Sequence, residues 1–98
     1  MLEKKLAKMP YAQAKVIYKD NNNVALKSYE TEVIIVTPDG WLNVYGLYSP
    51  TTRKHISAFM QEYTNKDYYF AKMLYETEQR YNIKTGEFAP LYNDREDL

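Results

Sequence analysis

The middle of the chain consists of short apolar runs separated by polar breaks. The runs are rich in β-branched and aromatic residues, which favour strands, and several alternate between apolar and polar positions. The breaks contain Asn, Asp, Pro and Gly, which favour turns. We therefore expect strands over residues 15–19, 24–28, 32–36 and 41–45.

The strongest turn signal lies between the last two of these strands, at Thr37-Pro38-Asp39-Gly40. Pro presets the first turn angle and Gly accepts left-handed backbone angles, so this stretch predicts a β-hairpin. A loop over residues 38–40 sets a register with two apolar cross-strand pairs, which we assign to the core. The pairs are Val36 with Leu42 and Ile34 with Val44.

The opposite face of this hairpin is also apolar. A face exposed to water would carry more polar residues, so we expect either a terminal segment or a partner protein to cover it. The residues of this candidate protein interface are Val33, Ile35, Trp41 and Tyr45.

After residue 48 the apolar positions recur every three and four residues, which is typical of amphipathic helices. Ser49 is a favoured N-cap and Pro50 a favoured first residue, so a helix is predicted to begin there and to run to Tyr63. A second helix is expected from Asn65 or Asp67 to about Tyr81. The helical spacing also predicts a short N-terminal helix, with apolar residues Leu2, Leu6 and Met9.

These elements predict an α+β fold, in which a small antiparallel sheet of three to four strands packs against two C-terminal helices and a short N-terminal helix precedes the sheet. No repeat or linker divides the sequence. We expect a single domain over residues 1–98, with its core at about 12–81 and an extended tail at 82–98.

Composition limits the classes of function. The absence of cysteine excludes disulfides and cysteine metal sites. The first residues are charged where a secretion signal needs an apolar stretch, and no apolar run is long enough to span a membrane. We therefore expect a cytoplasmic protein. Eleven tyrosines in 98 residues favour a contact surface, because Tyr combines an apolar ring with a polar tip.

The middle of the chain contains the pattern Ser28-Tyr29-x-Thr31-x-Val33, then Gly40, then Val44-x-Gly46-x-Tyr48-Ser49-x-Thr51-Thr52-x-Lys54-His55-Ile56-x-x-Phe59. This pattern resembles a family of short uncharacterised proteins of phages and mobile elements of Gram-positive bacteria. The resemblance covers about residues 24–63. It implies a viral or prophage setting, in the cytoplasm of a host cell, and no particular activity.

The start of the helix at Ser49 holds the densest group of polar side chains. A helix N-terminus offers unpaired N–H groups and a partial positive charge, which suit a phosphate or another anion. In the alternative interpretation, Ser49 and Thr52 only cap the helix and His55 is a structural residue. The candidate anion-binding residues are Ser49, Thr51, Arg53, Lys54 and His55.

We expect no catalytic residues, no metal and no cofactor. The chain has one histidine, and Ser57 points to a different side of a helix from His55. Residues 20–31 begin like a calcium-binding loop but lack its central Gly and final Glu. Three glycines do not form a phosphate-binding loop.

Three functions are consistent with these observations. The first is a phage-type accessory protein that binds a host protein, for example to inhibit a bacterial defence nuclease as anti-CRISPR proteins do. The second is a nucleic-acid-binding module, although the net charge of the chain is zero. The third is a structural or regulatory protein that self-associates as a homodimer through the apolar sheet face. Phosphate contacts in the second would come from Lys4, Lys5, Lys8, Lys15, Lys19, Arg53 and Lys54.

Overall fold

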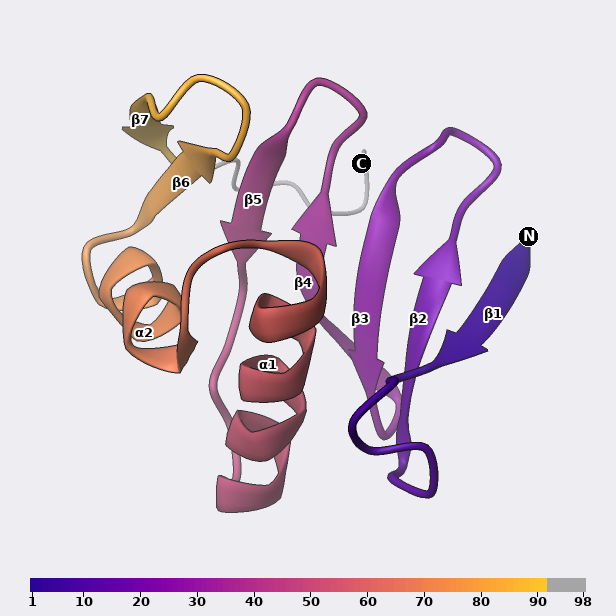
Figure 1. Ribbon diagram of the computed structural model, residues 1–98. Helices are drawn as coiled ribbons and strands as arrows, with labels where there is room; N and C mark the ends of the chain where they lie inside the picture. Colours follow the sequence, from indigo (N-terminus) through magenta and orange to yellow (C-terminus); the bar gives the residue numbers. More distant parts are fainter. Residues whose placement is uncertain (92–98) are drawn as a thin grey trace.

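In a computed structural model, which describes residues 1–91, the chain forms a seven-stranded antiparallel sheet with two helices on one face (Figure 1). The strands lie in the sheet in the order of the sequence. They are β1 (Leu2–Lys5), β2 (Ala14–Tyr18), β3 (Val24–Ser28), β4 (Thr31–Val36), β5 (Trp41–Val44), β6 (Gln79–Asn82) and β7 (Phe88–Pro90). The helices α1 (Pro50–Tyr63) and α2 (Tyr68–Glu76) connect β5 to β6.

This architecture corrects the expected fold. The sheet is larger than the three to four strands predicted, and the fold is mostly β within the described residues. The added strands come from both ends of the chain, where the sequence carried weaker signals. Both predicted C-terminal helices are present, and α1 spans the predicted residues.

The β4–β5 hairpin has the predicted register. Ile34 pairs with Val44 and Val36 pairs with Leu42. Three of these four side chains are fully buried, and Val36 is half-buried. Gly40 closes the turn with a φ of 100°, which a residue with a Cβ rarely adopts. The apolar pattern and the turn residues therefore specify this part of the fold.

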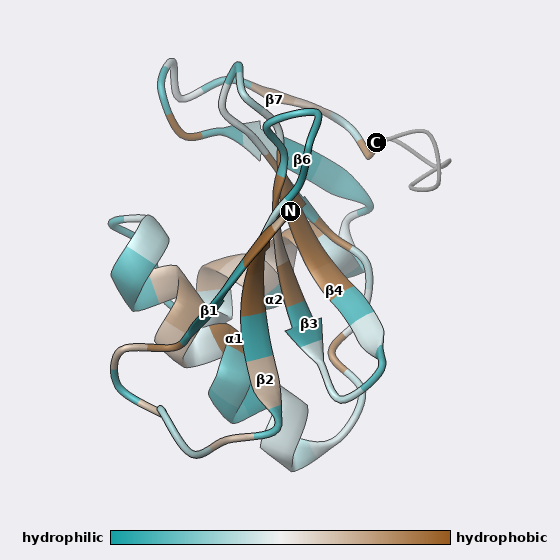
Figure 2. Cartoon of the chain, turned by 90° about the vertical axis from the view of Figure 1, so that its right-hand side faces the viewer, coloured by the Kyte–Doolittle hydropathy of each residue, from teal (hydrophilic) through white to brown (hydrophobic). Residues whose placement is uncertain are grey.

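The main core lies between the sheet and the two helices. One row of buried side chains crosses β2 to β5 directly, through Val16, Leu26, Ile34 and Val44. This row belongs to the same cluster as Ile56, Phe59 and Met60 of α1 and Ala71 and Leu74 of α2. Figure 2 shows both helices on one side of the sheet. Each fully buried Val, Leu, Ile, Phe or Met side chain of this cluster stabilises the fold by about 1.5–3 kcal/mol.

The other face of the sheet carries a smaller buried cluster. It consists of Ile17, Ala25 and Ile35, which are direct cross-strand neighbours, and Tyr45 packs against it. Figure 2 colours much of β4 as hydrophobic. Residues of β4 are buried on both faces of the sheet. A strand that is apolar on both faces is typical of the centre of a sheet.

A β-bulge changes the face that Val33 occupies. Leu26 pairs with Ile34 and Lys27 pairs with Glu32, so Val33 is the extra residue on β4. Its side chain is fully buried in the helix-side core. Strict alternation had placed Val33 beside Ile35 on the opposite face, and the bulge overturns that placement.

The predicted N-terminal helix is a strand. Residues 2–5 form β1, which pairs with β2 at the edge of the sheet. A turn follows, in which Met9 N–H donates to Leu6 O at 3.2 Å, and Leu6 is fully buried. The spacing of Leu2, Leu6 and Met9 thus arises from a strand and a turn. Strand pairing satisfies the backbone groups of this short segment, for which an isolated helix is unfavourable.

The second helix ends earlier than predicted. It stops at Glu76, and Glu78 has a φ of 52°, which redirects the chain into β6. Tyr81 pairs with Leu42 in the sheet, and its ring lies 4.8 Å from that of Phe70. Tyr81 therefore packs against α2 without belonging to it. Within the expected tail at 82–98, residues 88–90 form β7, and residues 92–98 lie outside the described residues.

Candidate functional site where the β3–β4 turn meets the start of helix α1

A chain of hydrogen-bonded hydroxyl groups, buried at Ser28 and Thr52, joins β3 to α1. Ser28 Oγ lies 2.9 Å from Thr52 Oγ1 and 2.8 Å from His55 Nδ1. Ser49 Oγ donates to Thr52 Oγ1 at 3.3 Å. If each hydroxyl donates to the next, the series runs from Ser49 through Thr52 and Ser28 to His55 Nδ1. This direction requires the neutral imidazole with its proton on Nε2.

Local sequence places each member of this network. Ser49 is the N-cap of α1 as predicted, because its Oγ accepts the Thr52 N–H at 3.2 Å and Pro50 occupies the first turn. Thr52 and His55 are three residues apart, so they share the helix face that is turned to the sheet. Ser28 is the last residue of β3 and meets that face.

Two tyrosines beside this network have left-handed backbone angles. Tyr29 has a φ of 54° and Tyr48 a φ of 48°. Bulky residues rarely adopt such angles, and each instance costs about 1–3 kcal/mol. Contacts hold both residues in place. Tyr29 N–H donates to Gln13 O at 2.8 Å, and its ring lies 5.9 Å from the His55 ring.

Gly46 provides the space for Tyr48. A Cβ at residue 46 would lie 2.3 Å from Cε2 of the Tyr48 ring, which is far inside van der Waals contact. The Tyr48 ring therefore packs directly on the Gly46 backbone. The combination of Gly46 and Tyr48 in the sequence pattern thus has a steric cause.

His55 is a structural residue of this network. Its side chain is 1% exposed, and burial lowers the pKa of the imidazole from its ordinary value of 6.5. The neutral form is favoured because a charged imidazole would lose its hydration. Ser28 is 3% exposed, so the Ser28–His55 pair is closed to a substrate.

The predicted anion-binding residues do not all face one common site. Ser49, Thr51, Arg53 and Lys54 are exposed around the first turn of α1. His55 instead faces the core and bonds Ser28. The exposed cations contribute positive charge at the helix start, but the histidine does not.

The predicted protein interface is divided by the fold. Val33 and Ile35 are buried on opposite sides of the sheet. Trp41 and Tyr45 are half-buried, and the guanidinium carbon of Arg80 lies 4.4 Å from the centre of the Trp41 ring. This cation–π contact covers part of the Trp41 surface with a side chain of the same domain.

Sequence reasoning did not assign a site role to Ser28 or Tyr29. Both occur in the pattern that carried the family resemblance, about twenty residues before Tyr48-Ser49. The two halves of that pattern meet at this site in space. The sequence signal that could have identified these two residues was the presence of adjacent Ser and Tyr residues in the first half of the pattern, as in the second half.

Two further properties concern the whole described part of the chain. Neither helix within residues 1–91 is long and apolar enough to cross a membrane. The same residues contain no group of three or more His, Cys, Asp or Glu side chains suited to hold a metal ion.

Comparison with known proteins identifies one family. The model of a family of unknown function, DUF8033, matches residues 4–77, which is most of the chain. No curated protein and no solved structure matches the chain. The match supports the expected similarity to an uncharacterised family, and it extends well beyond the pattern at residues 24–63.

Proposed function

We propose that this chain, which belongs to the DUF8033 family of unknown function, is a non-enzymatic binding protein that docks on an acidic surface of a partner protein. The docking surface is the end of the domain where α1 begins. The observation that carries the proposal is the pair Tyr29 and Tyr48, which are 51% and 56% exposed although their backbone is held in a costly conformation.

Rigid exposed tyrosines suit a protein interface. An aromatic ring that is already fixed loses little conformational entropy on binding, and tyrosines are enriched among the residues that dominate binding energy. Tyr29 is fixed by the Gln13 carbonyl and the His55 ring, and Tyr48 by the Gly46 backbone. The buried network of Ser28, Thr52 and His55 joins the elements that carry them.

Charge at this end favours an acidic partner. Arg53 and Lys54 are exposed on the first turns of α1, and the first turn has no acidic residue. The partial positive charge of a helix N-terminus adds to theirs. A partner surface rich in Asp and Glu would therefore associate faster and in a defined orientation.

The closed Ser28–His55 pair supports binding over catalysis. A serine hydroxyl 2.8 Å from an imidazole nitrogen has the distance of a nucleophile and its base. Both side chains are buried, and Thr52 occupies the other side of the Ser28 hydroxyl. The pair therefore acts as a structural hydrogen bond in this proposal.

The family resemblance suggests the setting. A phage or mobile-element protein would act in the cytoplasm of a bacterial host, and its partner would be a host protein. Inhibition of a defence nuclease, as anti-CRISPR proteins achieve, is one concrete form of this proposal, because nucleases carry acidic catalytic surfaces.

The experiment compares two double variants as affinity baits in bacterial host lysate. Tyr29→Ser with Tyr48→Ser should lose the partner that the wild-type protein retains, as quantified by mass spectrometry. The matched control, Tyr69→Ser with Tyr75→Ser, alters two exposed tyrosines of α2 and should retain it. Circular dichroism must show both variants folded. Equal retention by the two variants would contradict the proposal.

A further inference from the structure

A row of three lysines crosses the open face of the sheet at its N-terminal edge. Lys5 pairs directly with Lys15, and Lys15 pairs directly with Lys27. Direct partners in an antiparallel pair point to the same face, with Cβ atoms about 4.5–5.5 Å apart. Like charges in this arrangement repel, so the row needs anions nearby to be stable.

Two glutamates supply part of the required charge. Glu3 lies 3.3 Å from Lys15 Nζ, and Glu30 lies 3.6 Å from Lys27 Nζ. The Glu30 side chain is 94% exposed. Exposed pairs of this kind contribute little to stability, so another anion can displace these carboxylates. Glu32 pairs directly with Lys27 on the other side and lies 2.6 Å from Lys19 Nζ. When Lys19 and Glu32 are counted with the row, four lysines against three glutamates leave one positive charge on this face.

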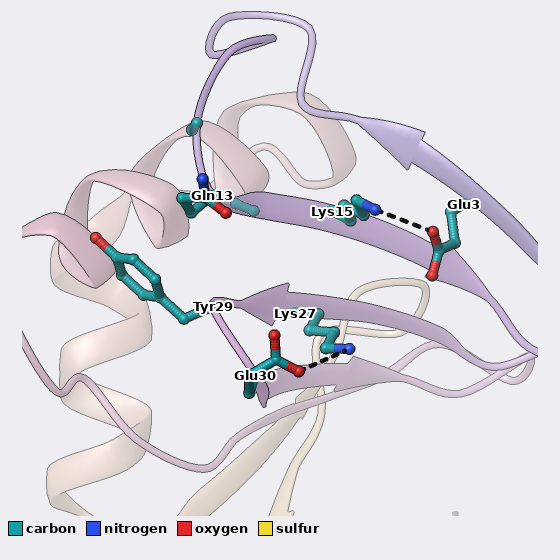
Figure 3. A pocket seen from close by; sticks show the side chains of 8 residues that line it. Glu3, Gln13, Lys15, Lys27, Tyr29 and Glu30 are labelled. Carbon is teal, nitrogen blue, oxygen red and sulfur yellow. Dashed lines mark hydrogen bonds and ion pairs between the residues drawn. The ribbon is translucent and has the colours of Figure 1, made fainter.

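A cavity of about 140 Å³ lies over this row. Figure 3 shows Lys15 and Lys27 on neighbouring strands, with Gln13 and Tyr29 toward one end of the cavity. The hydrogen bond from Tyr29 N–H to Gln13 O ties the two sides of that end together at 2.8 Å. The cavity is therefore shaped by backbone contacts and not only by mobile side chains. Its lining residues are Glu3, Ala12, Gln13, Ala14, Lys15, Lys27, Tyr29 and Glu30.

We infer that this cavity binds a phosphate group, with the ammonium groups of Lys15 and Lys27 as its direct ligands. A phosphate monoester carries a charge of about −1.5 to −2 and three acceptor oxygens, so one group can contact both lysines at once. A carboxylate carries a single charge and would only replace Glu30. Lys5 adds attraction at longer range.

The phosphate could be free or part of a nucleotide or a nucleic-acid backbone. The half-exposed Tyr29 ring at the end of the cavity is placed to stack on a base. This inference shares Tyr29 with the docking function proposed above, but phosphate binding depends on the lysine row and not on Tyr48, Arg53 or Lys54.

The test is a titration of the ¹⁵N-labelled protein with inorganic phosphate in a dilute chloride buffer, followed by NMR amide shifts. Residues 12–15 and 27–30 should respond. Lys15→Gln and Lys27→Gln should each weaken binding about tenfold. Glu30→Gln should strengthen it by roughly threefold, because a competing carboxylate is removed. Lys72→Gln makes the same charge change on α2 and should leave the affinity unchanged.

Three outcomes would overturn the inference: no shift with phosphate, equal effects of Lys27→Gln and Lys72→Gln, or binding abolished by Arg53→Gln with Lys54→Gln but not by Lys27→Gln. Parallel titrations with adenosine monophosphate and a single-stranded oligonucleotide identify the source of the phosphate. Tighter binding of the nucleotide, lost in Tyr29→Leu, would indicate base stacking. Tightest binding of the oligonucleotide, with a steep salt dependence, would indicate a nucleic-acid backbone. Equal binding of all three would indicate that the phosphate group alone is recognised.

Discussion

Ser28 and His55 lie 27 residues apart in the sequence and are joined by a buried hydrogen bond of 2.8 Å between Ser28 Oγ and His55 Nδ1. Ser28 Oγ also contacts Thr52 Oγ1, so a single hydroxyl connects the β3–β4 hairpin to the first turn of α1. Local sequence does not require these two segments to meet. The bond therefore helps to position α1 against the end of the sheet.

Ser28→Ala should lower the free energy of unfolding by about 1–3 kcal/mol, because it leaves the buried His55 Nδ1 without its partner and the Thr52 hydroxyl with only its contact to Ser49. Urea denaturation followed by circular dichroism measures this loss. Ser57→Ala is the matched control, since Ser57 is half-buried on α1 and only accepts a long hydrogen bond of 3.5 Å from Gln61. The control should change stability by about 0.5 kcal/mol or less. Equal losses in the two variants would show that the buried network contributes nothing specific.

Stability should fall as the pH drops below about 6.5, the ordinary pKa of histidine. Burial lowers the pKa of His55 in the folded state, so the unfolded chain binds the proton more tightly. The contribution of His55 is complete above pH 6.5 and is lost as the pH falls through its folded pKa. Urea midpoints measured from pH 7.5 to 5 should decrease more for the wild-type protein than for His55→Gln. Parallel curves for the two proteins would contradict this account.

Gly46→Ala should displace the Tyr48 ring with a modest loss of stability, about 1 kcal/mol or less, because the added methyl group would push the ring toward its exposed side and not into other protein atoms. A double-mutant cycle with Tyr48→Ser isolates the contact. The cost of Gly46→Ala should fall in the Tyr48→Ser background. An undiminished cost would mean that the backbone of residue 46, and not the ring, opposes the added methyl group.

Glu78→Gly should stabilise the protein by roughly 0.5–1 kcal/mol, because Glu78 has a φ of 52° at the junction of α2 and β6. Glu76→Gly, at the last residue of α2, should destabilise it by up to about 1 kcal/mol. Thermal denaturation of both variants measures whether each substitution raises or lowers the stability. A loss of stability in Glu78→Gly would show that its side chain, and not its backbone angle, determines its contribution.

The sequence specifies the fold best where several local signals agree. At the β4–β5 hairpin, the turn residues and the apolar alternation predict the same register, which the structure has. At Ser49-Pro50, the cap and the helical spacing predict the same helix start. Each signal depends only on residues within one element and its turn.

The sequence fails where long-range pairing decides the structure. Leu2, Leu6 and Met9 have helical spacing, but β2 offers residues 2–5 a partner for their backbone groups. Tyr81 continues the apolar spacing of α2, but it lies in the sheet because it pairs with Leu42 of β5. The bulge at Val33 arises from the pairing of β3 with β4, which single-strand alternation does not reveal.

The candidate site was predictable only in part. The cap by Ser49 and the exposed cations Arg53 and Lys54 follow from the helix pattern. The burial of His55 depends on Ser28, which arrives from another element. The exposure of Tyr29 depends on its position in the β3–β4 turn. The register of β3 against β4 sets the position of this turn, and the sequence alone does not give that register.

The contact between the β3–β4 turn and α1 is the basis of the proposed docking surface, and nuclear Overhauser measurements test it directly. His55 is the only histidine in the chain, so its ring protons can be assigned without ambiguity. The ring centres of Tyr29 and His55 are 5.9 Å apart, which predicts clear cross-peaks between their ring protons. Their absence in the folded protein at neutral pH would contradict the account.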